Sequence, residues 1–213
     1  MTRHARQVVL LLAALAAVAV GAAPAPGSSP AKPWASTDTV ARARQVARAV
    51  DARYAGLRVT EASSTAVIES LRLFDDPLNP RLVPASNGIY FSVCPNRARC
   101  PYPARRAARR PGALAPRRVA LDLAVHSFLE TSADLVVVSL PTTAFIVLVF
   151  ERTLLNAPDV SEVLSAWPPG DTSAPLRSVV DANTLPRLYL PFGLESTPTG
   201  GDSLLAFPLR LTR

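Results

Sequence analysis

Four polar residues, Arg118, Asp122, His126 and Glu130, recur at every fourth position near the middle of the chain. On a helix this spacing places all four side chains on one face, with His126 between two carboxylates. An imidazole flanked by carboxylates is able to bind a divalent metal ion or to transfer protons. Asp122, His126 and Glu130 are therefore the candidate residues for a hydrolytic or metal-dependent site.

The same spacing also predicts the solvent-exposed side of an amphipathic helix. The buried side would then consist of the apolar residues Val119, Leu121, Val125, Phe128 and Leu129. Asp122 and Glu130 would lie roughly 12 Å apart along the helix axis, too far for both to bind one ion readily. We favour this second interpretation, and we expect neither a metal nor another cofactor.

Other catalytic signatures are absent from the sequence. It has no G-x-S-x-G motif, and its 9 Gly leave little material for a phosphate-binding loop. The adjacent acids Asp75 and Asp76 precede Pro77, a pattern typical of a turn. The sequence therefore favours a non-enzymatic function.

The strongest charge signal is a stretch of arginines that contains no acidic residue. Its members are Arg97, Arg99, Arg105, Arg106, Arg109, Arg110, Arg117 and Arg118. Guanidinium groups bind phosphates and carboxylates bidentately, so an exposed basic loop at 94–118 could bind anionic lipid headgroups, a wall polymer or an acidic protein. The alternative is a solvated loop in an Arg-rich protein. Nucleic acid is a poor candidate because we expect the chain to be exported.

Cys94 and Cys100 are the only cysteines, and they enclose five residues of this basic loop. An even number of cysteines in an exported chain predicts a disulfide bond, which would stabilise so short a loop by about 2 kcal/mol. Free thiols and half of a metal site are the alternatives, although no further Cys or His lies nearby.

The N-terminus has the order of a secretory signal peptide over residues 1–25. Arg3 and Arg6 precede an apolar run at 8–20, and small residues follow it. We expect cleavage near Ala22–Ala25 and, from the Pro- and Ser-rich composition of residues 26–36, a flexible linker. An uncleaved N-terminal anchor is the alternative. Because no later stretch is long and apolar enough to span a membrane, the protein is expected to be secreted or extracytoplasmic.

Residues 37–213 are expected to form a single domain. Apolar residues spaced three and four apart predict helices at 38–54, at 116–130 and at 159–167. Alternating or continuous apolar runs predict two hairpins and a strand between them: 57–59 with 66–74 through Ser63 and Ser64, 88–94, and 135–140 with 144–150. Residues 75–84 are expected to be a loop, and the Pro-rich part from residue 168 is expected to hold only short strands near 187–190 and 204–211.

One segment of the chain is similar in pattern to a later segment of the same chain. Residues 40–73, shifted by 78 positions, superpose helix on helix and hairpin on hairpin, with Thr65–Ile68 on Thr143–Ile146. This suggests an αββ internal duplication, for which chance identity in an Ala-rich chain is the alternative. Helices packed on a mostly antiparallel sheet make an α+β fold. Over residues 89–150 the order of strand, helix and hairpin resembles the core of GerMN domains, which occur in exported actinobacterial proteins.

Composition narrows the class of protein further. The chain has 213 residues, a formal net charge of +7 and 49% hydrophobic residues, which exclude a collagen, a disulfide-dense miniprotein, a polytopic membrane protein and a fully disordered chain. Lys32 is the only lysine, and this preference for arginine is typical of high-GC coding, as in many actinobacteria. We therefore expect an exported bacterial envelope protein that acts by binding or as a structural accessory, with an exported hydrolase or metal-dependent enzyme as the alternative.

Overall fold

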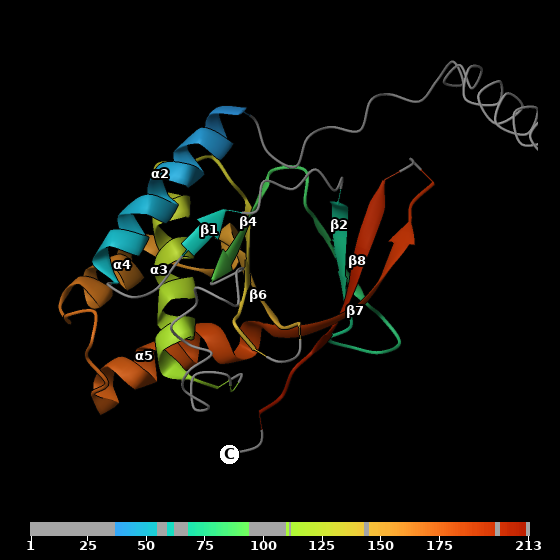
Figure 1. The fold of residues 1–213 in the computed structure, drawn as a ribbon. Coiled ribbons are helices and arrows are strands. Elements are labelled where there is room, and N and C mark those ends of the chain that lie inside the picture. Colours follow the sequence, from blue (N-terminus) through green and yellow to red (C-terminus); the bar gives the residue numbers. More distant parts are fainter. Residues whose placement is uncertain are drawn as a thin grey trace, which may run out of the picture. The chain divides into compact units, whose positions relative to one another are not determined.

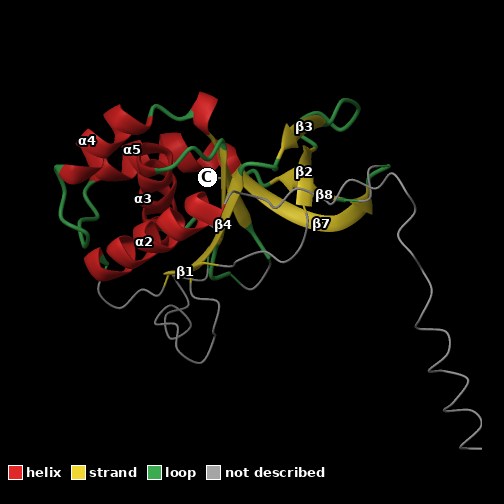
Figure 2. Cartoon of the chain, turned by 90° about the horizontal axis from the view of Figure 1, so that it is seen from above, coloured by secondary structure: helices red, strands yellow, loops and turns green. Residues whose placement is uncertain are grey.

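The computed structural model describes residues 37–54, 59–61, 68–93, 110, 112–142, 145–198 and 201–211, which belong to one compact unit that spans residues 31–213. In chain order its elements are α2 (Thr37–Arg53), β1 (Val59–Glu61), β2 (Ile68–Leu73), β3 (Arg81–Pro84), β4 (Gly88–Val93), α3 (Leu114–Glu130), β5 (Leu135–Ser139), β6 (Val147–Glu151), η3 (Arg152–Leu154), α4 (Ala157–Ser165), α5 (Ala174–Thr184), η4 (Leu185–Arg187), β7 (Leu188–Ser196) and β8 (Asp202–Pro208). The helices gather on one side of the sheet (Figures 1 and 2).

The strands form one mixed sheet in the order β1-β4-β5-β6-β7-β8-β2-β3. The β4–β5 and β2–β8 pairs are parallel, and the other five pairs are antiparallel. The prediction of an α+β fold with a mostly antiparallel sheet is therefore confirmed. As expected from their apolar sequences, β5 and β6 lie in the interior of the sheet under the helices, and every residue of β5 is buried.

Two hydrophobic cores lie on opposite faces of the central strands. The larger core packs α2, α3, α4 and α5 against β4, β5 and β6. The smaller core lies on the other face of β5 and β6, where their side chains pack with those of β2 and β8. Tyr189 of β7 also belongs to this core. Strand β7 pairs with β6 over only two residues and with β8 along most of its length. The pairing with β8 is irregular between Pro191 and Gly193, and such an irregularity bends a strand, which makes room for this second core. The strands β2, β3, β7 and β8 thereby turn away from the helix layer (Figure 2).

Helix α3 is the centre of the helical layer, because α2, α4 and α5 all pack against it. Of its 17 residues, 13 are buried. Pro116 stands in its first turn, as predicted, where a missing N–H costs nothing. None of the helices formed by the described residues is both long enough and apolar enough to cross a membrane.

The predicted hairpin between residues 57 and 74 is wrong. Strand β1 pairs with β4, whereas β2 pairs with β3 and β8 at the other end of the sheet order. The order α2-β1-β2 does repeat as α3-β5-β6, but only β5 and β6 pair with each other. The suggested αββ duplication therefore does not extend to the strand pairing.

Two further expectations need correction. Residues 81–84 form the edge strand β3 within the expected loop, and Pro84 is tolerated there because an edge strand leaves backbone groups unpaired. The Pro-rich part from residue 168 holds the helix α5 and a hairpin of nine and seven residues, β7 and β8. Pro175 lies at the start of α5 and Pro208 at the end of β8, whereas Pro191 lies within β7, next to the irregularity in its pairing with β8.

Candidate functional site

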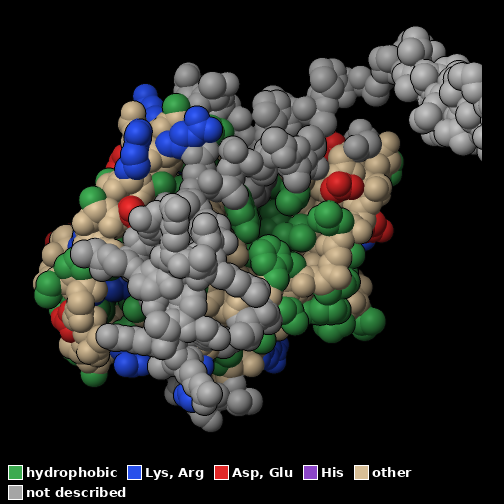
Figure 3. All heavy atoms as spheres, in the orientation of Figure 1, with side chains coloured by type: hydrophobic (Ala, Val, Ile, Leu, Met, Phe, Trp, Pro, Cys, Tyr) green, Lys and Arg blue, Asp and Glu red, His purple; other side chains and the backbone are tan. Residues whose placement is uncertain are grey.

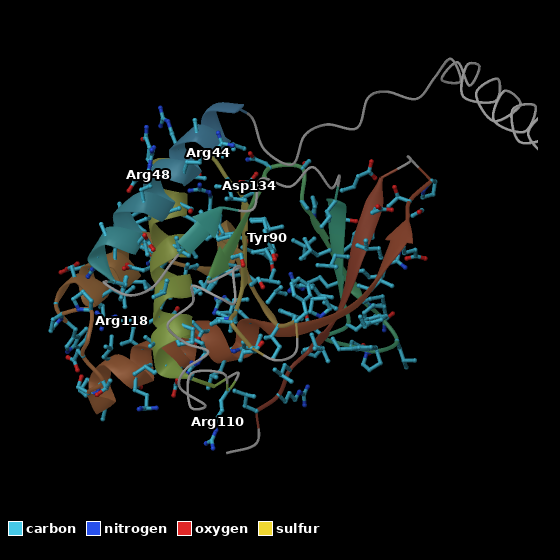
Figure 4. The ribbon with its side chains drawn as sticks, viewed as in Figure 1. Arg44, Arg48, Tyr90, Arg110, Arg118 and Asp134 are labelled. Atoms are coloured by element: carbon cyan, nitrogen blue, oxygen red, sulfur yellow. The ribbon has the colours of Figure 1, made fainter. Side chains whose placement is uncertain are left out.

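Arg118 lies on α3 with 1% of its surface exposed, among the helices (Figure 4). Its Nη1 donates hydrogen bonds to the carbonyl oxygens of Pro168, at 2.7 Å, and Pro169, at 3.2 Å, and its Nη2 donates to that of Trp167, at 2.8 Å. Its guanidinium also lies 5.7 Å from the centre of the Tyr54 ring. Arg118 therefore holds the segment that follows α4 against α3.

Arg117 is also buried, with 2% of its surface exposed. Its Nη1 donates to the Thr184 hydroxyl at 2.7 Å, and its Nη2 donates to an Asp181 carboxylate oxygen at 2.6 Å and to the Gly112 carbonyl at 3.0 Å. Both Asp181 and Thr184 belong to α5. Arg117 thus connects α3 to α5 as Arg118 connects it to the end of α4.

Asp122 is the third buried charged residue of α3, with 1% of its surface exposed. Its carboxylate accepts a hydrogen bond from Arg53 Nη1 of α2 at 3.2 Å. Burial raises the pKa of the neighbouring Tyr54 well above its ordinary value of 10.0, and the Asp122 charge raises it further. The Arg53 guanidinium compensates this buried charge and connects α2 to α3, so that removal of either partner would leave the other uncompensated.

His126 and Glu130 continue the row toward solvent, with 33% and 50% of their side chains exposed. His126 Nε2 lies 3.7 Å from Asp122 Oδ1, and its Nδ1 lies 3.4 Å from Glu130 Oε1. Among the described residues, no three His, Cys, Asp or Glu side chains are grouped so that they could hold a metal ion. Within the part of the chain that the structure describes, no further ligand reaches His126 from another element.

The prediction of a solvated helix face holds for only part of this row. Glu130 is exposed and His126 is partly exposed, but Arg118 and Asp122 are buried because α2 and the segment after α4 cover that side of α3. The periodicity of α3 itself could not reveal this, since a buried, charged helix face looks like an exposed one in the sequence.

The arginines of the basic stretch differ in their exposure to solvent. Arg110 is exposed, whereas Arg117 and Arg118 are buried and donate to protein acceptors, so these two do not belong to an exposed anion-binding loop. This corrects the expected end of the basic loop at residue 118, because α3 begins at Leu114. The remaining members (Arg97, Arg99, Arg105, Arg106 and Arg109) and both Cys94 and Cys100 lie outside the described residues.

A second group of arginines lies on α2. Arg42 donates to the Glu130 carbonyl at 3.2 Å, and Arg53 donates to Asp122, so both face α3. Arg44 and Arg48 are exposed and project away from the sheet (Figure 4). Basic side chains gather over this helix in the space-filling view (Figure 3).

Three phenylalanines from distant parts of the sequence form an exposed cluster. The rings of Phe192 and Phe207 stack with centroids 4.4 Å apart, and Phe74 lies 5.5 Å from Phe192 and 5.1 Å from Phe207. Phe192 is 50% exposed and Phe207 is 43% exposed. Leu190 pairs with Phe207 in the strand register, so it lies on the same face and is 37% exposed. We call these four residues the aromatic face.

A cavity of about 370 Å³ lies at the C-terminal end of α3, beside η3. Arg152 lines it, but its guanidinium donates to the carbonyl oxygens of Phe128, Thr131 and Ala133 at 2.6 to 2.8 Å. These bonds satisfy backbone acceptors that the helix end leaves without partners. Arg152 therefore has a structural role at this cavity.

No family model, no curated protein and no solved structure matches the chain.

Proposed function

We propose that this protein is an exported, non-enzymatic binding domain of the bacterial envelope, and that it binds a partner protein through the aromatic face. The observation that carries the proposal is the exposure of Phe192 and Phe207, which stack on each other in contact with solvent. Large exposed apolar groups that touch one another mark interaction sites more often than scattered ones do. The expected signal peptide supports the export of the chain.

The position of the aromatic face suits protein recognition. Its residues come from β7, β8 and the residue that follows β2, so paired strands hold them. An ion pair between Arg72 and Glu195, 2.6 Å long, provides a polar neighbour on these same strands. Aromatic side chains held on a rigid support, with polar groups around them, contribute most of the free energy at many protein interfaces.

The charged residues of α3 support a binding role over a catalytic one. Arg117, Arg118 and Asp122 are buried and bonded to neighbouring elements, where they stabilise the helix packing. An acid or base that acts on a substrate must reach it. On α3, His126 and Glu130 are the ionisable side chains that solvent reaches, and His126 Nδ1 lies 3.4 Å from Glu130 Oε1.

Site-specific photocrosslinking of the full chain in an exporting bacterial host tests the proposal. A photoreactive phenylalanine analogue at Phe192 should yield a discrete adduct with a protein, while the same analogue at Ser178, an exposed residue of α5, should not. Leu190→Ser with Phe207→Ser should reduce the yield at Phe192 at least fivefold, because both remove contact area. Equal adducts at Phe192 and Ser178, or a yield unaffected by the two serines, would argue against the aromatic face as a binding site.

A further inference from the structure

We propose that the partner bound by the aromatic face is a second copy of this chain. The strands β2, β3, β7 and β8, which we call the half-sheet, would then pack face to face with the same strands of the other copy. This inference rests on the proposed function, because it names the partner of the same surface.

The half-sheet has one covered face and one outer face. The covered face contributes residues of β2, β3 and β8 to the smaller core, namely Leu71, Leu73, Val83 and Ala206. Successive strand residues point to opposite faces, so Leu82 and Leu205 lie on the outer face, in one row with Arg72 between them. Within the described part of the chain, no residue of β2, β3 or β8 belongs to the larger core under the helices, from which these strands turn away (Figure 2). The outer face therefore lacks the second layer on which an apolar sheet face normally packs.

The apolar area of the outer face suits a dimer. Leu82 is 59% exposed, more than any residue of the aromatic face, and it extends the apolar surface to the edge strand β3. Large apolar side chains have surfaces of roughly 150–250 Å², so at these exposures the outer face presents roughly 400 Å² of apolar surface per chain. Homodimer interfaces are about 65% apolar, so two such faces correspond to an interface of roughly 1,200 Å². Specific interfaces begin at about this size.

The charges on the outer face also favour a second copy. Arg72 and Glu195 form an ion pair of 2.6 Å, and both side chains remain partly exposed. They lie on the outer face, because Arg72 pairs in register with Leu205 and Glu195 with Ser203. A two-fold axis brings the same patch of both copies together, so a patch with charges of one sign would repel itself. This ion pair has one charge of each sign, and it offers no excess charge to a strongly basic or acidic partner.

Edge-to-edge pairing of two half-sheets is the less suitable arrangement. Strand β3 ends the sheet, but it has only four residues and the last of them is Pro84. Proline has no N–H to donate, and at a sheet edge it opposes the addition of another strand. The two copies are therefore expected to pack through the side chains of their outer faces, as stacked sheets do about 10 Å apart.

Photocrosslinking with two differently tagged copies of the full chain identifies the partner. Both copies are produced together in the exporting bacterial host, and one of them carries the photoreactive analogue at Phe192. The adduct should contain both tags, whereas the analogue at Ser178 should give no such adduct. An adduct with a different protein would overturn this inference and leave the proposed function intact, while the absence of any adduct at Phe192 would overturn both.

Sedimentation of the purified full chain measures the affinity of the two copies for each other. Leu82→Arg should weaken dimerisation about 100-fold, because the change occurs twice in a symmetric dimer and each unpaired charge in an apolar contact costs about tenfold. The matched control is Leu154→Arg, which adds the same charge at a leucine of η3 that is 56% exposed. It should change the dissociation constant less than about threefold.

Equal dissociation constants for the two variants, or an unmodified chain that stays monomeric, would overturn the inference. Circular dichroism and thermal unfolding verify that both variants are folded, as expected for substitutions at exposed positions.

Discussion

At the scale of single residues, arginine occupies two contrasting environments in this protein. Arg44 and Arg48 are exposed, whereas Arg117 and Arg118 are among the largest fully buried side chains. A guanidinium has five donors in a planar fork, so it can bond several carbonyl oxygens at once while its stem packs against apolar groups. Arg118 uses this property to bond carbonyl oxygens of the segment after α4, and Arg117 uses it to bond two side chains of α5.

We predict that Arg118→Lys destabilises the protein by about 3 kcal/mol, although the charge is kept. A lysine ammonium is a single point and cannot replace donors that reach Trp167 and Pro168 from two nitrogens, and hydrogen bonds to charged groups contribute about 1.5–3 kcal/mol each. Urea unfolding at pH 7 measures the change. Arg177→Lys, at an exposed position of α5, is the control and should stay within about 0.5 kcal/mol of the unmodified protein. A similar small effect for Arg118→Lys would show that these bonds do not hold the structure together.

At the scale of elements, the parallel pair β2–β8 joins parts of the chain that are far apart in the sequence. Gly201 precedes β8 and lies against Glu69 of β2, so closely that a Cβ atom at Gly201 would overlap the Glu69 side chain. Moving the Glu69 side chain aside would disturb the hydrogen bond of 2.7 Å that its carboxylate accepts from the Thr197 hydroxyl. Thr197 N in turn donates to the Gly201 carbonyl at 2.7 Å. The absence of a side chain at Gly201 thus lets β2, β7 and β8 meet.

Gly201→Ala is therefore expected to destabilise the protein by about 1–2 kcal/mol, as overpacking does in other buried places. Gly170→Ala is the control, because nothing lies within 4 Å of a Cβ atom at that position. Thermal unfolding of the two variants gives the comparison. In Gly201→Ala, amide hydrogen exchange should also accelerate in β8 more than in α3. If both alanines proved equally harmless, the close approach of Gly201 to Glu69 would have no energetic weight.

The elements differ in how far the sequence predicted them. Helices α2, α3 and α4, the strands β2 and β4 and the hairpin β5–β6 follow from local patterns, and the structure has them close to the predicted bounds. Local patterns do not predict helix α5, because prolines near it disfavour long elements. Ser173 before Ala174-Pro175 is the signal that could have identified its start, since serine and proline are favoured at the beginning of a helix.

At the scale of the whole molecule, each of the two cores contains a buried tyrosine beside an aspartate. Tyr54 faces Asp122 in the core under the helices, and the Tyr189 hydroxyl donates to Asp75 at 2.8 Å at the edge of the smaller core. Burial raises the pKa of Tyr189 above its ordinary value of 10.0, and the hydrogen bond to Asp75 raises it further. Both phenols therefore stay neutral in the folded protein at a pH at which they ionise in the unfolded chain.

This predicts a loss of stability in alkali that involves both cores. Below about pH 10 both states hold the phenol protons, and the stabilisation is fully present; above it only the unfolded chain releases them, so the free energy of unfolding falls. Each tyrosine contributes a slope of about 1.4 kcal/mol per pH unit. Urea unfolding between pH 8 and pH 11 measures the slope. Tyr54→Phe with Tyr189→Phe should flatten it, and an unchanged slope in this variant would assign the alkaline loss to other groups.

Most of the local elements follow from the sequence, with α5 and β3 as exceptions, because helix and strand periodicity, helix boundaries and proline positions act over a few residues. The sequence also determined the α+β class, which follows from the order of those elements. The separation of β1 from β2, the burial of Arg117, Arg118 and Asp122, and the meeting of three phenylalanines on one face are visible only in the folded chain. These features depend on contacts between residues many positions apart, where pairing and burial are set by the packing of the whole domain and not by the pattern of any one segment.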